Sequence, residues 1–155
     1  MRVIGIIPAR LAATRLPDKP LLDICGKPMI QRVWERAQMS ACLDDVLIAT
    51  PDERIRAVVE GFGGRAVMTS DIHRSGTDRL AEAATKLDAE IIVNIQGDEP
   101  LIEPDSIERA VGPLLGDRAL MMSSLMCPCP EEDIDNPACV KVVCDHAGTA
   151  AAGSG

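Results

Sequence analysis

The sequence predicts an α/β fold, a three-layer sandwich in which helices cover both faces of a mainly parallel sheet. Two observations carry this prediction. Three short apolar runs, at residues 3–8, 45–50 and 90–95, have the composition of strands that are buried on both faces. The stretches between and after these runs carry apolar residues at helical spacing. Strands and helices that alternate in this way form right-handed crossovers and a parallel sheet.

The first half of the chain supplies two strands and two helices. The run VIGIIP at 3–8 is continuously apolar and ends at a proline, and DVLIAT at 45–50 repeats the pattern. Residues 28–39 predict the first helix, because Pro28 suits a first turn and the apolar residues lie on one stripe. That stripe consists of Met29, Ile30, Val33, Trp34 and Ala37. Residues 51–62 have the same period and predict the second helix.

The second half continues the alternation and then loosens. Residues 76–87 and 104–115 predict two more helices, on either side of the strand EIIVNI at 90–95. Two further strand candidates, 120–126 and 138–144, flank an acidic turn that contains proline. We therefore expect one domain over residues 1–148, followed by a linker-like tail at 149–155.

Length and charge exclude several classes of protein. A chain of 155 residues fits one domain, and 16 basic against 24 acidic residues give a net charge of −8. A general nucleic-acid surface needs a basic face, and base stacking needs aromatic side chains, of which the chain has two. The sequence contains no apolar run long enough to cross a membrane and no signal peptide, so we expect a cytoplasmic protein without membrane insertion.

The six cysteines do not match a known metal motif. Cys127 and Cys129 are spaced C-x-C, and Cys139 and Cys144 are spaced C-x4-C, whereas zinc ribbons use C-x2-C pairs. With no sign of secretion, reduced thiols are expected.

A cationic loop follows the first strand. Arg10, Arg15 and Lys19 lie within ten residues of each other in an otherwise acidic protein. Guanidinium groups donate forked hydrogen bonds to phosphate oxygens, and an ammonium adds a mobile charge, so this loop suits a polyphosphate. The alternative is a solvated loop whose cations pair with surface acids. Neither G-x4-G-K-[ST] nor G-x-G-x-x-G is present.

The third strand leads into QGDEP at 96–100. Gly97 permits a tight turn and Asp98 places a carboxylate at the carboxyl end of the strand, where α/β sheets bind ligands. A hard cation such as Mg²⁺, bridging protein and phosphate, uses one or two such carboxylates. A turn acid with no metal role is the alternative.

A second polar loop, HRSGTDR at 73–79, precedes a predicted helix. Ser75 or Thr77 suits an N-cap, which accounts for those residues without a ligand. Capping leaves the two arginines and His73 unexplained, so this loop is also a candidate to face a ligand.

Five segments together resemble the 3-deoxy-manno-octulosonate cytidylyltransferase family, also called CMP-Kdo synthetases. They occur in the order IIPARLAATRLPDKPL, GKPMIQRVWERA, TSDIHRSGTDRLAEA, VNIQGDEPLI and NPACVKVV, across residues 1–148. The resemblance implies a nucleotide-diphospho-sugar transferase fold and the transfer of CMP from CTP to Kdo, with release of pyrophosphate. It also implies Mg²⁺ as cofactor, a role in lipopolysaccharide biosynthesis, and a homodimer for the full-length family member.

The resemblance also implies roles for individual residues. Arg10 and Lys19 would hold the triphosphate with Arg15 in support, and Ala9 would contribute backbone near the nucleotide. Asp98 would bind Mg²⁺, with Arg10 and Lys19 completing the catalytic set. Gln96 would face the sugar acid, and Arg74, Ser75 and Gly76 would line the cytosine and sugar pocket.

The sequence departs from the family pattern at its C-terminus. Family members continue well beyond the point where this chain reads TAAAGSG, and the missing part resembles the source of a second metal-binding aspartate. The fold is therefore expected to be incomplete there. Two alternatives stay open: a cytidylyltransferase for another sugar acid, such as an acylneuraminate, and a nucleotide-binding fragment without catalytic activity.

Overall fold

A parallel sheet is the centre of the structure. The computed structural model describes residues 1–11, 16–146 and 148–150, and the chain forms two compact units, Met1–Ser123 and Ser124–Gly155. The sheet of the first unit has the order β5-β4-β1-β6, and each neighbouring pair is parallel. This confirms the predicted sheet. Its strands are β1 (Val3–Pro8), β4 (Asp45–Thr50), β5 (Arg65–Met68) and β6 (Ile91–Asn94).

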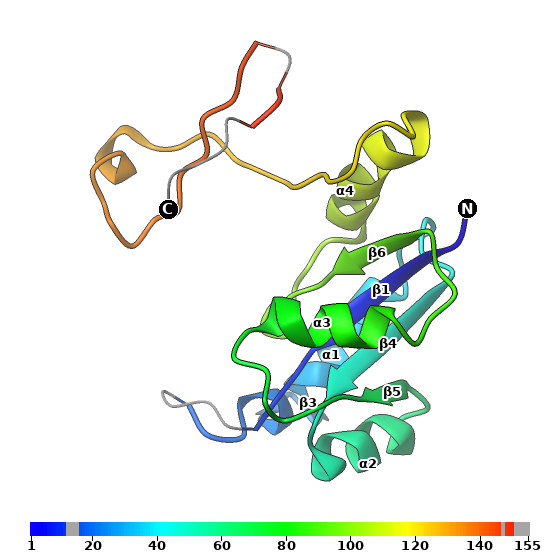
Figure 1. Cartoon of the computed structure of the whole chain (residues 1–155). Coiled ribbons are helices and arrows are strands. Elements are labelled where there is room, and N and C mark those ends of the chain that lie inside the picture. Colours follow the sequence, from blue (N-terminus) through cyan, green and yellow to red (C-terminus); the bar gives the residue numbers. More distant parts are fainter. Residues whose placement is uncertain (12–15, 147, 151–155) are drawn as a thin grey trace. The chain divides into compact units, whose positions relative to one another are not determined.

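Helices cover both faces of this sheet, as predicted (Figure 1). Buried residues of α1, α2 and α4 pack against one face, whereas α3 packs against the other. The helices are α1 (Met29–Ala37), α2 (Glu53–Gly61), α3 (Gly76–Ala84) and α4 (Pro104–Gly116). All four predicted helices are confirmed: α3 and α4 begin at the predicted residues, and the other bounds differ from the predicted ones by one to three residues.

The alternation of side chains along β1 explains the three layers. Val3 and Ile7 belong to the core beneath α1, α2 and α4, whereas Ile4 and Ile6 belong to the core beneath α3. All four side chains are buried. A strand with both faces covered must be apolar throughout, which is why its sequence shows no polar alternation.

Two short strand elements were not predicted. β5 (Arg65–Met68) has only four residues, begins with an arginine and lies at the edge of the sheet, so its sequence signal is weak. A small hairpin joins β2 (Asp23–Ile24) to β3 (Lys27–Pro28). Both residues of its tight turn, Cys25 and Gly26, have positive φ, as a two-residue hairpin turn requires. A 3-10 helix, η1 (Lys19–Leu21), precedes this hairpin.

The predicted strands at 120–126 and 138–144 are wrong. Residues 121–130 have no regular secondary structure, residues 138–139 lie in a turn, and the one bridge in this part of the described chain joins Cys144 to Ala150. A strand needs a neighbour to receive its backbone hydrogen bonds. Within the described residues the only pairing of these segments is that isolated bridge at Cys144, and Met121, Met122 and Val143 are exposed. The remaining short helix of the second unit is η2 (Glu131–Asp133). The single domain expected over 1–148, with a tail from 149, stays a prediction.

The core predicts a large cost for a truncation in β4. Ile48 is fully buried on the face covered by α1 and α2, so Ile48→Ala should lower the free energy of unfolding by about 2–5 kcal/mol. Ile72→Ala removes the same atoms from an exposed side chain and should change it by less than about 0.5 kcal/mol. Urea denaturation measures both variants. Equal losses would contradict the burial of Ile48.

Candidate active site

The carboxyl ends of β1 and β6 meet at one edge of the sheet. The two strands are adjacent and parallel, with Ile6 opposite Asn94, so the segments that follow them lie side by side. Together with the η1 segment they form a pocket. Its lining contains five of the predicted site residues, Ala9, Arg10, Lys19, Gln96 and Asp98, together with Pro8, Pro20 and Gly97.

Gly97 allows this close approach. A Cβ atom at that position would lie 3.0 Å from the carbonyl oxygen of Pro8 and 3.5 Å from Cγ2 of Ile7. Any side chain at residue 97 would therefore push the two segments apart. The same loop places Gln96 and Asp98 on the exposed surface of the pocket, where both can meet a ligand.

An ion pair joins the cationic loop to the carboxylate loop. Lys19 Nζ lies 2.6 Å from Oδ2 of Asp98, and both side chains are partly exposed. Buried Pro20 fixes the start of η1, and Asp18, which precedes it, pairs with Arg54 at 3.1 Å. Lys19 is therefore held at the pocket by the segment that carries it as well as by Asp98.

Of the two cations of this loop that the structure describes, Arg10 and Lys19, Arg10 is the one without an ion pair. It is exposed and lines the pocket, and no ion pair of the described residues includes it. The residues on either side are anchored: the amide of Ala9 donates to the carbonyl of Ala49, and the amide of Leu11 donates to Asp52 Oδ2, each at 2.9 Å. Arg15 lies outside the described residues.

A second hollow adjoins the first and shares Pro8, Ala9, Arg10 and Gln96 with it. Its other lining residues, Ser75, Gly76 and Arg79, come from the start of α3. Ser75 is the N-cap: its hydroxyl oxygen accepts from the amide of Asp78 at 3.0 Å and its hydroxyl donates to Oδ2 of Asp78 at 2.7 Å. Gly76 packs on β1, since a Cβ there would lie 3.3 Å from Cγ of Pro8.

Of the two arginines in the loop HRSGTDR, Arg79 lines a hollow and Arg74 does not. Arg74 is exposed and does not line either hollow, so its role at the ligand stays a prediction. Arg79 does line the second hollow and is buried. The sequence indicated it only as one of the two arginines that capping leaves unexplained, and the family resemblance gave it no role. The available signal was its spacing: it lies three residues after Gly76, on the same side of the helix.

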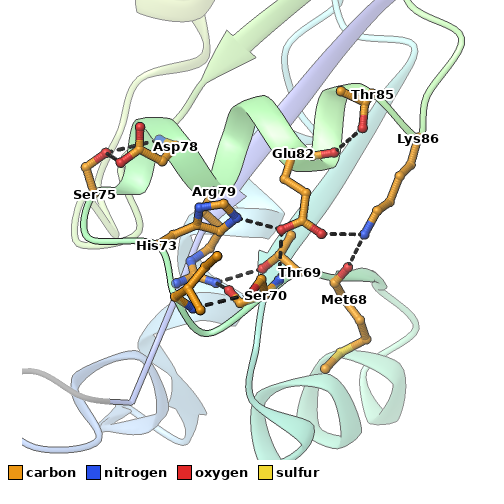
Figure 2. Close-up of polar contacts among 11 residues, drawn as sticks. Met68, Thr69, Ser70, His73, Ser75, Asp78, Arg79, Glu82, Thr85 and Lys86 are labelled. Atoms are coloured by element: carbon orange, nitrogen blue, oxygen red, sulfur yellow. Dashed lines mark hydrogen bonds and ion pairs between the residues drawn. The ribbon is translucent and has the colours of Figure 1, made fainter.

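Glu82 of α3 and Lys86, just beyond its end, hold the loop that precedes the helix (Figure 2). Glu82 accepts from the amide of Ser70 at 2.8 Å, from Lys86 at 2.7 Å, and contacts His73 Nε2 at 2.6 Å. Lys86 also donates to the carbonyl of Met68 at 2.7 Å. The hydrogen bonds from Lys86, the Ser70 amide and His73 lower the pKa of Glu82 to about 2. Glu82 is therefore a fixed anion that ties residues 68–73 to α3.

The donor set at Asp98 fits a shared magnesium ion. Among the described residues, no group of three His, Cys, Asp or Glu side chains could hold a metal by itself. Mg²⁺ needs few protein ligands when phosphates supply the rest, typically one or two carboxylates. Asp98 is the one carboxylate that lines the pocket, beside Arg10 and Lys19. This arrangement suits a metal that arrives with a phosphate ligand.

Fold and site together define the class of protein. A parallel sheet covered on both faces, with a cationic loop and a carboxylate at its carboxyl edge, is the nucleotidyltransferase-like fold. More narrowly, the chain belongs to the cytidylyltransferase family, whose model matches residues 4–154.

Individual relatives agree with this assignment. The chain is 52% identical over 151 residues to a 3-deoxy-manno-octulosonate cytidylyltransferase of Geotalea uraniireducens, and the match covers 97% of this chain and 60% of that protein. A structure of CMP:2-keto-3-deoxy-manno-octonic acid synthetase complexed with CTP is 49% identical, with a TM-score of 0.76 over 77% of this chain and 50% of that one. A cytidylyltransferase of Leptospira borgpetersenii is 26% identical, with a TM-score of 0.67 over 76% and 50%. The chain thus spans about 60% of the length of the curated relatives it matches.

The lowered pKa of Glu82 predicts an acid-sensitive fold. Because this pKa lies below the ordinary carboxyl value of about 4.3, the stabilisation from Glu82 is complete above that value and is lost as the pH falls toward 2. The thermal midpoint of the parent should therefore fall more steeply between about pH 5 and pH 2 than that of Glu82→Gln. Circular dichroism at a series of pH values measures this. Glu53→Gln, which alters an exposed ion pair with Arg56, should follow the parent; a Glu82→Gln curve as steep as the parent's would contradict the prediction.

Proposed function

We propose that this chain carries the nucleotide site of a cytidylyltransferase that joins CMP from CTP to Kdo and releases pyrophosphate. The observation that carries the proposal is the pocket where Arg10, Lys19, Gln96 and Asp98 meet. Relatives at about half identity bear the name 3-deoxy-manno-octulosonate cytidylyltransferase, and a structural neighbour at 49% identity was solved with CTP.

The reaction depends mainly on neutralising the charge of the leaving group and on positioning the two substrates. The anomeric hydroxyl of the sugar acid attacks the α-phosphorus of CTP and gives up its proton to solvent, while the bond from that phosphorus to the bridging oxygen breaks and pyrophosphate leaves with the electron pair. Arg10 and Lys19 neutralise the negative charge that grows on the leaving group. Gln96 lines both hollows, which supports its proposed role of hydrogen bonding to the sugar acid.

Mg²⁺ is the proposed cofactor, with Asp98 as its protein ligand. When bound, it would orient and polarise the phosphates. Lys19 stands beside the same carboxylate, so the pair brings a cation and a metal ligand to one point of the pocket. Ser75 and Gly76 line the second hollow, where cytosine and sugar are proposed to lie.

The wider setting is part of the proposal. The product would supply lipopolysaccharide synthesis in the cytoplasm, and the full-length protein would form a homodimer. In the described residues no helix is long and apolar enough to cross a membrane.

Two linked measurements test the proposal. CTP with Mg²⁺ should raise the thermal midpoint of the folded chain more than ATP, GTP or UTP do, because a ligand at 100 times its dissociation constant adds about 2.7 kcal/mol, or several degrees. Pyrophosphate should then appear when Kdo is added, and not with an acylneuraminate. Binding of CTP without pyrophosphate release would assign the chain as a nucleotide-binding fragment and refute catalysis by it.

The metal role of Asp98 is tested by Asp98→Asn. The amide loses the charge that attracts Mg²⁺, so the magnesium concentration that gives half of the CTP-dependent thermal shift should rise about tenfold or more. Asp105→Asn, on the exposed face of α4, removes one carboxylate elsewhere and should leave the titration unchanged. If both variants titrate like the parent, Asp98 is a turn residue only.

A further inference from the structure

Arg79 is a buried cation that no carboxylate contacts. The residue is 2% exposed, and its Nη1 donates to Oγ1 of Thr69 at 2.7 Å and to the carbonyl of Ser70 at 3.0 Å. Both acceptors are neutral, and none of the ion pairs among the described residues includes Arg79. Buried charges in proteins are normally paired, because removing them from water is costly. The guanidinium of Arg79 therefore has an unfilled requirement for negative charge.

Burial and a neighbouring positive charge make the unpaired guanidinium of Arg79 still less favourable. Burial lowers the pKa of Arg79, and the positive charge of Arg10 lowers it further; Asp52, Glu82 and Asp71 act in the opposite direction without contacting it. An arginine remains protonated under such shifts. Two guanidinium groups thus face one hollow and repel each other, and no carboxylate lines that hollow. An anion placed between them would relieve both the burial and the repulsion.

One edge of the Arg79 guanidinium, formed by Nε and Nη2, carries no hydrogen bond to the described residues. Nη1 is the nitrogen that bonds to Thr69 and Ser70, and Arg79 lines the hollow with Arg10, Ser75 and Gln96. In the described part of the chain, every fully buried side-chain nitrogen or oxygen has a hydrogen-bond partner. Nε and Nη2 of Arg79 have no hydrogen-bond partner among the described residues, so each keeps a small solvent contact although the residue as a whole is 2% exposed. Because Arg79 lines the hollow, we infer that these two nitrogens are the ones an anion there would meet.

The support behind Arg79 is rigid. Glu82 fixes the amide of Ser70, whose carbonyl accepts from Arg79, and the amide of Thr69 donates to the carbonyl of Thr50 at 3.0 Å (Figure 2). Both acceptors of Arg79 are therefore tied to α3 or to β4. The start of α3 adds the positive end of its dipole beside the same hollow. A guanidinium held in this way needs no reorganisation when an anion arrives.

We propose that Arg79 is an oxyanion-binding residue, whose free edge acts with Arg10 to hold a phosphate or carboxylate group of a substrate. The proposal rests on the proposed function for the identity of that substrate: the group is a phosphate of the nucleotide or the carboxylate of the sugar acid. In this proposal Nη1 of Arg79 holds the loop, and the edge formed by Nε and Nη2 binds the ligand.

Titration calorimetry with inorganic pyrophosphate, with the sugar acid and with uncharged cytidine tests this on the full chain. Arg79→Gln should raise the dissociation constant of one of the two anions about tenfold or more, the range for a charged hydrogen bond, and leave that of cytidine unchanged. The anion that is affected identifies the source of the oxyanion. Arg65→Gln is the matched control: it also removes one guanidinium, from an ion pair with Asp45 at the amino end of β4 and β5, and should bind like the parent.

A purely structural role gives a different pattern. If Arg79 only holds the loop, Arg79→Gln weakens cytidine and both anions to the same extent, or none of them, and either result overturns the proposal. A parent chain that binds neither anion overturns it as well. Should Arg79→Gln fail to fold, Arg79→Lys decides the question, because an ammonium keeps the positive charge but cannot donate along two edges as a guanidinium does. In Arg79→Lys, one anion should bind several-fold more weakly while cytidine binds as it does to the parent. Equal weakening of all three ligands would again refute the proposal.

The titration with pyrophosphate distinguishes the oxyanion role of Arg79 from the proposed cytidylyltransferase activity. Pyrophosphate binding that depends on Arg79, in a chain that never turns over CTP and Kdo, would refute catalysis and keep the oxyanion site. Turnover and anion binding that are both unchanged in Arg79→Gln would keep the enzyme and refute the role of Arg79.

Discussion

The parallel pairing of β1 with β4 and β6 is the constraint on which the rest of the structure depends. Because neighbouring strands point the same way, their carboxyl ends lie at one edge, and segments some 90 residues apart in sequence meet there. Gly97 then determines how closely they meet, at the carbonyl of Pro8. The positions of Arg10, Gln96 and Asp98 follow from this pairing rather than from any contact among the three side chains.

Positive charge at the site is local and is positioned by very different means. The chain carries a net charge of −8, yet both hollows are lined by cations. Lys19 is held by a carboxylate, Arg10 is solvated, and Arg79 is buried against neutral oxygens. These states differ in how much free energy an incoming anion can gain: it must compete with Asp98 for Lys19 and with water for Arg10, whereas at Arg79 it displaces no carboxylate of the described residues and little water.

The sequence predicted strands best where both faces of the strand are covered by helices. The strands at 3–8 and 45–50 were predicted to the residue, because both faces are covered and the apolar run ends where the sheet ends. The same pattern at 120–126 was misleading, since an apolar run does not show whether a neighbouring strand exists. The meeting of residues 9–10 with 96–98 was predictable from topology. The burial of Arg79 was not, because it depends on where the loop from Thr69 to Ser75 packs, and that loop is held by long-range charged contacts.

The exposed sulfur of the second half of the chain has a chemical consequence. Met121, Met122 and Met126 are 93%, 83% and 63% exposed, and the thiols of Cys127 and Cys129 follow them directly, also exposed. Thioethers and thiols accessible to solvent are the first groups that peroxide converts to sulfoxide and sulfenic acid, whereas Met29, inside the core, is shielded. Residues 121–129, which line neither hollow, are therefore one place where oxidation would add polar oxygen to an apolar stretch; Met39, which is 64% exposed, and the exposed thiol of Cys25 are others.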